Sequence, residues 1–356
     1  MLTTAELVQL VDLTALNAFP REKGWLDSIK QRIVDGKTVG SLQSESSRHI
    51  REILGRYPEL IDSTFSIGIN ESSTDIYGIS CGLCNAFIRQ KVGRNQIIIP
   101  DGILKLIRLY ADYTTIMPLM QSSRRTKTIS IDGQILSELE AFSDAIMASI
   151  VHYVDTGESI ANLEGLLGPT AKLNADVGYT GAVIFLVAHE MGHLKLGHLD
   201  GDSFRSARMP PPLAISELIN VSKAEELEAD YYAFLAFSNQ YRELSISSVL
   251  IMFGAFSFAE TFGTPSGESH PLTVNRMIHL AAMTKFDGDP EMAEAVRFKI
   301  AKEIEMFYRL ADIRREHNNA RSLVEKHMPI ETAESIIERV SMVVMHDGVG
   351  YLDVCD

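Results

Sequence analysis

The stretch Ala188–His189–Glu190–Met191–Gly192–His193 closes the apolar run Gly181–Val187 and has the pattern HExxH. A continuous apolar run ahead of the motif predicts a buried helix. Positions i and i+4 of a helix lie about 40° apart around its axis, so His189 and His193 would present two imidazoles on one face. Glu190 flanks that face, where it would take a proton from an attacking water. These polar groups are costly to desolvate unless they bind something.

A second charged segment, Glu226–Leu227–Glu228–Ala229–Asp230, makes a metal site more plausible than two ordinary surface histidines. A catalytic zinc ion takes three protein ligands and keeps one position open, and two histidines with a glutamate are a common set. We therefore expect His189, His193 and Glu226 to bind Zn²⁺. Asp230 lies one helical turn after Glu226, and we expect it to accept a hydrogen bond from a ligand histidine and fix its tautomer.

Composition limits the class of protein. The chain has 356 residues, 46% of them apolar, and a net charge of −14, so it can bury a substantial core. Its lysines and arginines are scattered, which argues against nucleic acid or an anionic membrane as a partner. The most apolar stretch, Ile246–Phe258, is too short to span a bilayer. Three cysteines and no leader-like start indicate a cytoplasmic protein.

The expected fold class is α+β and mostly helical. Residues 1–60 read as helices broken by proline and glycine. Over residues 64–100 the apolar period changes to two, which predicts a small antiparallel sheet of three or four strands: Phe65–Ile69, Ile76–Ile79, Ala86–Val92 and Gln96–Ile99. We expect helices over Ile103–Met117, ended by Pro118, and over Leu136–Tyr153.

Two further motifs have an open role. Cys81 and Cys84 form a CxxC pair, but a redox pair needs a strand-to-helix context and a four-cysteine zinc site needs two more ligands, of which only Cys355 remains. His198 follows His193 by five residues, whereas metzincins place a third histidine about six residues on. On a continuing helix His198 would point away from His189, so we expect it to support the site rather than to bind metal.

The order HExxH, then ExxAD, then His270–Pro271 with Arg276 resembles the gluzincin peptidases of the HtpX and CAAX-prenyl-protease group, which are membrane-embedded. The chain is more similar to the soluble Lit phage-exclusion peptidases, which share the spacing to His198 and the block Glu225–Asp230. The likeness covers roughly residues 64–100 and 180–280. It implies a zincin-like metallopeptidase core, in which a small antiparallel sheet packs on the HExxH helix, with helical additions.

The helix and strand patterns, together with the resemblance, predict a division of the chain. Residues 1–60 would be an N-terminal helical segment and residues 286–356 a C-terminal one. Residues 61–285 would be the metallopeptidase core, with a helical insertion over about 103–175, metal-binding helices over 178–242 and a His-Pro segment over 269–285.

The function expected from the motifs and the resemblance together is that of a cytoplasmic zinc endopeptidase whose substrate is a protein or peptide. The resemblance further implies a host-defence enzyme that is held inactive until an activating partner or peptide triggers it. It makes His270 a candidate catalytic residue and Arg276 a partner of the acidic residues. The alternative is a non-catalytic sensor or scaffold stabilised by zinc, in which His198 or His270 would close the metal site as a fourth ligand.

Overall fold

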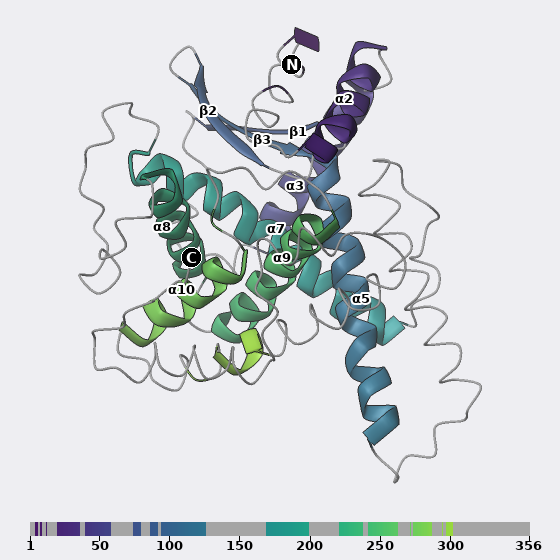
Figure 1. Cartoon of the computed structure of the whole chain (residues 1–356), viewed down its shortest axis with the longest axis vertical. Coiled ribbons are helices and arrows are strands. Elements are labelled where there is room, and N and C mark those ends of the chain that lie inside the picture. The colour runs from purple at the N-terminus through teal and green to yellow at the C-terminus, as the bar shows by residue number, and fades with distance from the viewer. Residues whose placement is uncertain are drawn as a thin grey trace.

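The computed structural model describes residues 4–5, 8, 12, 20–35, 40–57, 74–79, 86–91, 94–125, 169–198, 221–237, 241–262, 271, 273–286, 294 and 297–301. Their elements follow in the order α2 (Pro20–Val34), α3 (Gly40–Arg56), β1 (Thr74–Ile79), β2 (Phe87–Lys91), β3 (Arg94–Pro100), α5 (Asp101–Arg125), α7 (Pro169–Lys195), α8 (Val221–Leu235), α9 (Arg242–Phe262) and α10 (Thr273–Phe286) (Figure 1). The described part of the chain is therefore mostly helical with one small sheet, in agreement with the expected α+β class.

The sheet has three strands in the order β1-β3-β2. β2 and β3 pair antiparallel, but β1 and β3 run parallel, so the expected antiparallel sheet is wrong for one of its two pairings. The reason lies in the central strand. Ile97, Ile98 and Ile99 of β3 are fully buried, and a continuous apolar run that is buried on both faces is typical of a strand with a parallel neighbour. The segment Phe65–Ile69 lies outside the described residues.

α7 is the central helix of the molecule and carries the HExxH motif near its C-terminal end. Every residue from Gly178 to Gly192 is buried, which confirms the prediction of a buried helix from the apolar run. The helix contacts α5, α8 and α9, and Figure 1 shows it enclosed among them. A helix that is hydrophobic on all sides is stable only when other elements cover it.

Glycines allow α9 to approach its neighbours closely. A Cβ atom added to Gly181 of α7 would lie 1.8 Å from the hydroxyl oxygen of Ser248. A Cβ atom added to Gly254 of α9 would lie 2.1 Å from the ring of Tyr110 on α5. Contacts this short do not occur between real atoms, so the packing of α9 on both helices requires glycine at these two positions.

α5 runs to Arg125, so the expectation that Pro118 ends this helix is wrong. A proline inside a helix removes one backbone hydrogen bond and costs about 3 kcal/mol, but its backbone angle is compatible with a helix. The N-terminal half of α5 is buried in the same hydrophobic cluster as α7 and α9, for example at Leu106, Ile107 and Tyr110. The packing of that half supports the helix as a whole. The expected helix over Leu136–Tyr153 lies outside the described residues.

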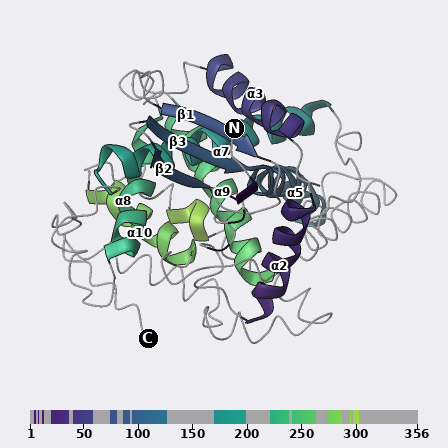
Figure 2. The same ribbon diagram turned by 90° about the horizontal axis from the view of Figure 1, so that it is seen from above.

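The N-terminal helix α3 packs along β1, as Figure 2 shows from above. Ile50 and Ile53 of α3 belong to the same hydrophobic cluster as the sheet and α7. The hydroxyl of Ser47 accepts a hydrogen bond of 2.8 Å from the backbone N–H of Gly78 in β1. The helix therefore covers the sheet and shares one core with α7.

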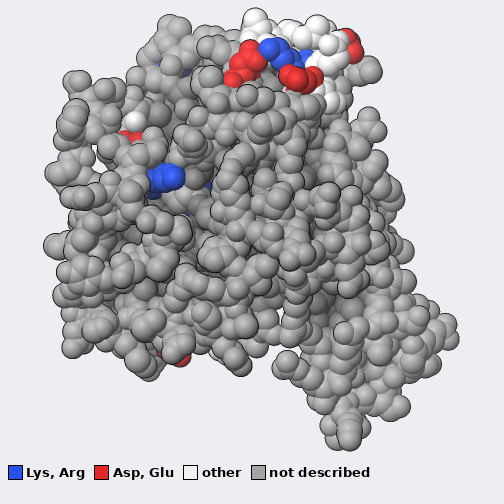
Figure 3. Space-filling view, viewed as in Figure 1, with Lys and Arg blue, Asp and Glu red and all other residues white. Residues whose placement is uncertain are grey.

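Charged side chains on the face shown in Figure 3 gather over α2, where acidic and basic groups lie side by side. Lys30 of α2, for instance, pairs with Asp12 at 2.6 Å. None of the described helices is both long and apolar enough to cross a bilayer.

Candidate metal centre

The site forms where α7 and α8 approach each other most closely. A Cβ atom on Gly192 of α7 would lie 3.1 Å from Cα of Ala229 and 3.2 Å from the ring of Tyr232, both on α8. Glycine inside HExxH and alanine inside ExxAD therefore let the two backbones come together. As a result, the carboxylate of Glu226 can reach the histidines of α7.

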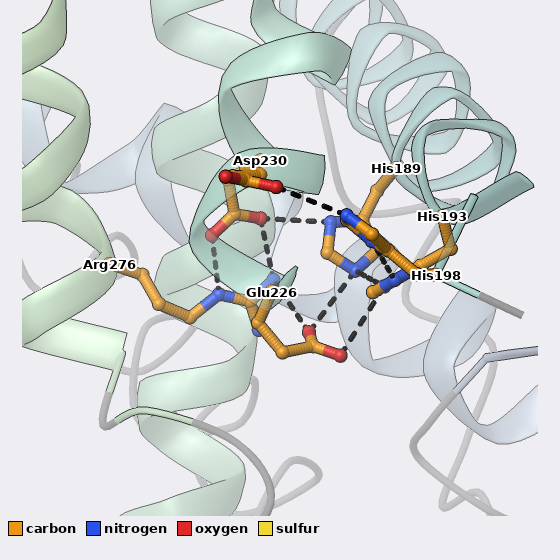
Figure 4. A network of polar contacts seen from close by, with 7 residues as sticks. His189, His193, His198, Glu226, Asp230 and Arg276 are labelled. Atoms are coloured by element: carbon orange, nitrogen blue, oxygen red, sulfur yellow. Dashed lines mark hydrogen bonds and ion pairs between the residues drawn. The ribbon is translucent and has the colours of Figure 1, made fainter. Parts of the chain in front are cut away.

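His189 and His193 of α7 meet Glu226 of α8 at this crossing (Figure 4). Nε2 of His189 lies 3.2 Å from Nε2 of His193 and 3.2 Å from Oε2 of Glu226. Nε2 of His193 lies 3.3 Å from Oε1 of Glu226. The three side chains are 6%, 12% and 12% exposed, so water screens them only weakly.

These separations fit a bound divalent cation. In a tetrahedral zinc site, bonds of about 2.0 Å hold neighbouring donor atoms about 3.3 Å apart. The two Nε2 atoms lie 3.2 Å apart, which matches that spacing, and each of them approaches a different oxygen of Glu226. One possible ligand atom from each of the three residues lies within 4.8 Å of the others. Two imidazole nitrogens facing each other also repel unless a proton or a cation lies between them. The buried group of His189, His193 and Glu226 could therefore hold a metal ion.

Asp230 and Arg276 hold the ring of His189 from its Nδ1 side. Oδ1 of Asp230 lies 3.0 Å from Nδ1 of His189, which leaves Nε2 of the same ring facing the metal position. Arg276 of α10 donates two hydrogen bonds to the Asp230 carboxylate, of 2.7 and 2.6 Å (Figure 4). Its guanidinium also lies over the rings of Phe253 and Phe256. The Arg276–Asp230 pair is buried and fixes the carboxylate in one orientation.

The charges around His189 favour a cation at the site. Burial by itself lowers the pKa of His189, but the hydrogen bonds and charges of Asp230 and Glu226 outweigh burial and raise the pKa to about 10. Burial by itself raises the pKa of Asp230, but Arg276 and His189 outweigh it and hold the pKa below its ordinary value. Burial lowers the pKa of His193, which favours the neutral imidazole that binds metals.

Glu190 is buried beside the ligands, with 5% of its surface exposed. Burial and the charge of Glu226 raise its pKa, the charges of His189 and Arg276 lower it, and the net result is a pKa of about 7. A carboxyl group that titrates near neutral pH can both accept and release a proton under ordinary conditions. Its environment therefore suits a general base.

His198 lies behind His193. α7 ends at Lys195, and Gly197 adopts a left-handed backbone conformation with φ of 77°. This turn brings Nδ1 of His198 to 3.0 Å from Nδ1 of His193. Nε2 of His198 lies 3.2 Å from Oε2 of Glu228 on α8.

The structure thus brings together His189, His193, Glu226, Asp230 and Arg276, with Glu190 beside them. The contact of His198 with Glu228 had no signal in the sequence, because a helix places Glu228 about 200° around its axis from Glu226. His279 was also not singled out. It is 4% exposed, neither of its ring nitrogens has a hydrogen-bond partner, and burial lowers its pKa to about 4. His270, Cys81 and Cys84 lie outside the described residues.

Comparison of the chain with family models, with curated proteins and with solved structures finds no match.

Proposed function

We propose that the chain is a zinc-dependent endopeptidase in which His189, His193 and Glu226 bind the metal and Glu190 is the general base. The observation that carries the proposal is the cluster of His189, His193 and Glu226, in which one possible ligand atom from each side chain lies within 4.8 Å of the others. The acid beside it, whose pKa is raised to about 7, supports a hydrolytic rather than a purely structural role. A zinc ion at this position would polarise the scissile carbonyl and lower the pKa of water.

Three residues of the chain would have the remaining catalytic and positioning roles. The carboxylate of Glu190 removes a proton from the attacking water and then delivers it to the departing amine nitrogen. Asp230 keeps Nδ1 of His189 protonated, so that Nε2 of this ring is the ligand atom. Arg276 holds Asp230 in place through its two hydrogen bonds. The low exposure of the ligands keeps bulk water from screening these charges.

The proposal extends to the finer features that the resemblance implies. The sheet and α7 would form a zincin-like core of the gluzincin type, similar to that of the Lit phage-exclusion peptidases. The enzyme would work in the cytoplasm on a cellular protein, and a partner or peptide would trigger it. His270 would then assist the transition state from the segment ahead of α10.

Expression of the chain beside its Glu190→Gln variant tests the proposal. We expect both proteins to purify with one zinc ion, since Glu190 is not a ligand, whereas only the parent should generate new protein N-termini in a proteomic comparison of the host cells. Glu225→Gln, a matched change one residue before the ligand Glu226, should keep both properties. If the Glu190 variant produced the same new termini as the parent, Glu190 would not be the base.

The same experiment separates the peptidase from the scaffold. Stoichiometric zinc without any parent-specific cleavage, with or without phage infection as a trigger, would favour a zinc-stabilised sensor or scaffold. Absence of zinc from the parent protein would contradict both.

A further inference from the structure

Each of the two candidate histidine ligands has its own carboxylate behind it, but the two arrangements differ. His189 contacts the carboxylate of Asp230 directly, at 3.0 Å. His193 reaches a carboxylate only through a second imidazole. Nδ1 of His193 lies 3.0 Å from Nδ1 of His198, and Nε2 of His198 lies 3.2 Å from Oε2 of Glu228.

This chain of contacts allows one assignment of protons that leaves a lone pair for the metal. A carboxylate only accepts hydrogen bonds, so Nε2 of His198 must carry the proton that faces Glu228. In a neutral imidazole the other nitrogen is then an acceptor, so Nδ1 of His198 accepts from Nδ1–H of His193. Nε2 of His193 is left without a proton, and this is the atom that faces Nε2 of His189 and Oε1 of Glu226.

We infer that His198 and Glu228 are positioning residues that fix the tautomer and ring orientation of His193 for metal binding, an inference that rests on the proposed zinc site. His198 is not a fourth ligand. Its contact with His193 lies on the Nδ1 side of that ring, whereas the metal position lies on the Nε2 side. Within the described part of the chain, the donor atoms that converge come from His189, His193 and Glu226 alone.

The end of α7 is built to hold His198 in this place. The backbone N–H of His198 donates to the carbonyl of His193 at 2.9 Å, and the N–H of Gly197 donates to the carbonyl of Leu194 at 3.2 Å. With Gly197 at φ of 77°, these bonds form a Schellman turn, which reverses the chain directly after the helix. The turn places the imidazole of His198 beside that of His193 in an edge-to-face arrangement, with ring centroids 5.1 Å apart and an interplanar angle of 68°. The side chain is only 8% exposed.

Zinc affinity of the purified full-length chain tests the inference without a protease assay. Competition with a chelating dye would compare the parent with His198→Leu, which removes the acceptor, and His198→Asn, whose amide oxygen can take the place of Nδ1. We expect His198→Leu to bind zinc about 10- to 100-fold more weakly and His198→Asn to recover most of that loss. Glu228→Leu should weaken binding in the same direction.

Two matched controls separate positioning from a general loss of structure. His49 contacts the Tyr179 hydroxyl at 3.1 Å, away from the ligands, so His49→Leu should keep the parent affinity. Glu225→Leu changes a neighbouring glutamate of α8 and should do the same. Far-UV circular dichroism checks the helix content of every variant. If His198→Leu fails to fold, the contrast between His198→Asn and Glu228→Leu decides the question.

X-ray absorption of the zinc protein and the visible spectrum of its cobalt form report the ligands themselves. We expect two imidazole ligands in the parent and in His198→Asn, with a cobalt spectrum that shifts in His198→Leu. Unchanged affinity and spectrum in His198→Leu would overturn the inference, and so would a third imidazole in the parent that this variant loses. A parent that binds no zinc would overturn the inference and the proposed function together. A parent that binds zinc but cleaves nothing would overturn only the peptidase, while the affinity series still decides the role of His198.

Discussion

Replacement of Arg276 by leucine should destabilise the metal-free protein severely. Arg276 is 5% exposed and Asp230 is fully buried, so water cannot take over the two hydrogen bonds, of 2.7 and 2.6 Å, that the guanidinium donates to the carboxylate. Removing one partner of a buried ion pair costs about 3–5 kcal/mol, and it would leave the Asp230 carboxylate with His189 as its remaining partner, at 3.0 Å. The pKa of Asp230 should rise in this variant, because the charge and the hydrogen bonds of Arg276 help to hold it below its ordinary value.

Three further variants identify the cause of the expected loss in the free energy of unfolding. Arg276→Lys keeps the charge but not the two-pronged contact, so we expect a smaller loss of about 1–2 kcal/mol. The double variant Arg276→Leu/Asp230→Leu should lose clearly less than the sum of the two single changes, because neither charge is then left alone. Arg48→Leu is the matched control. Arg48 pairs with Glu52 at 3.6 Å on the surface of α3, and its loss should cost at most about 0.5 kcal/mol.

Urea unfolding followed by far-UV circular dichroism, in the presence of a chelator at neutral pH, measures these free energies. Zinc binding, measured separately, should weaken by about 10- to 100-fold in Arg276→Leu, because the carboxylate that orients His189 loses its own support. A free energy of unfolding for Arg276→Leu within about 1 kcal/mol of the parent would refute this account of the pair.

Two further predictions concern Glu190 and the packing of α9. Burial raises the pKa of Glu190 from 4.5 to about 7, so in the metal-free protein its contribution to stability is present below pH 4.5 and is lost as the pH rises through 7. Urea unfolding with a chelator should therefore show that the free energy of unfolding of Glu190→Gln increases relative to that of the parent between pH 5 and 8, by up to about 3 kcal/mol. A difference in the free energy of unfolding that does not change with pH would contradict the raised pKa. Gly254→Ala should lower the melting temperature, because the new methyl group would overlap the ring of Tyr110. Gly55→Ala on α3, where a Cβ atom meets nothing within 4 Å, should instead leave stability unchanged or raise it by up to about 1 kcal/mol.

Local periodicity explains what could be predicted of the candidate site. A helix repeats every 3.6 residues or so, and its backbone hydrogen bonds alone set the directions of side chains four residues apart. The pairs His189 with His193, and Glu226 with Asp230, could therefore be assigned to single helix faces before any fold was known. The apolar run before His189 predicted burial of α7 for the same reason, because a helix without a polar face needs cover on all sides.

Two predictions were wrong because they rested on local sequence rules, whereas the packing of the whole core decides these features. Pro118 lacks a backbone N–H and was expected to end its helix, but α5 continues through it to Arg125. The alternation of apolar residues identified strands without telling which strand would be central. The burial of β3 on both faces, which is typical of strands with parallel neighbours, became evident only in the tertiary structure.

The sequence by itself determined the chemistry that this protein can offer: two imidazoles on one turn of a buried helix, an acid beside them, and a second helix with carboxylates at the matching spacing. Tertiary structure decided which groups meet. The contact of Gly192 with Ala229 brings α8 to α7, the pairing of Arg276 with Asp230 joins residues far apart in the chain, and the turn at Gly197 sets His198 between His193 and Glu228. The physical reason is the separation in sequence over which each interaction acts. Backbone hydrogen bonds within a helix span four residues, whereas the approach of two helices depends on the fit of all side chains between them.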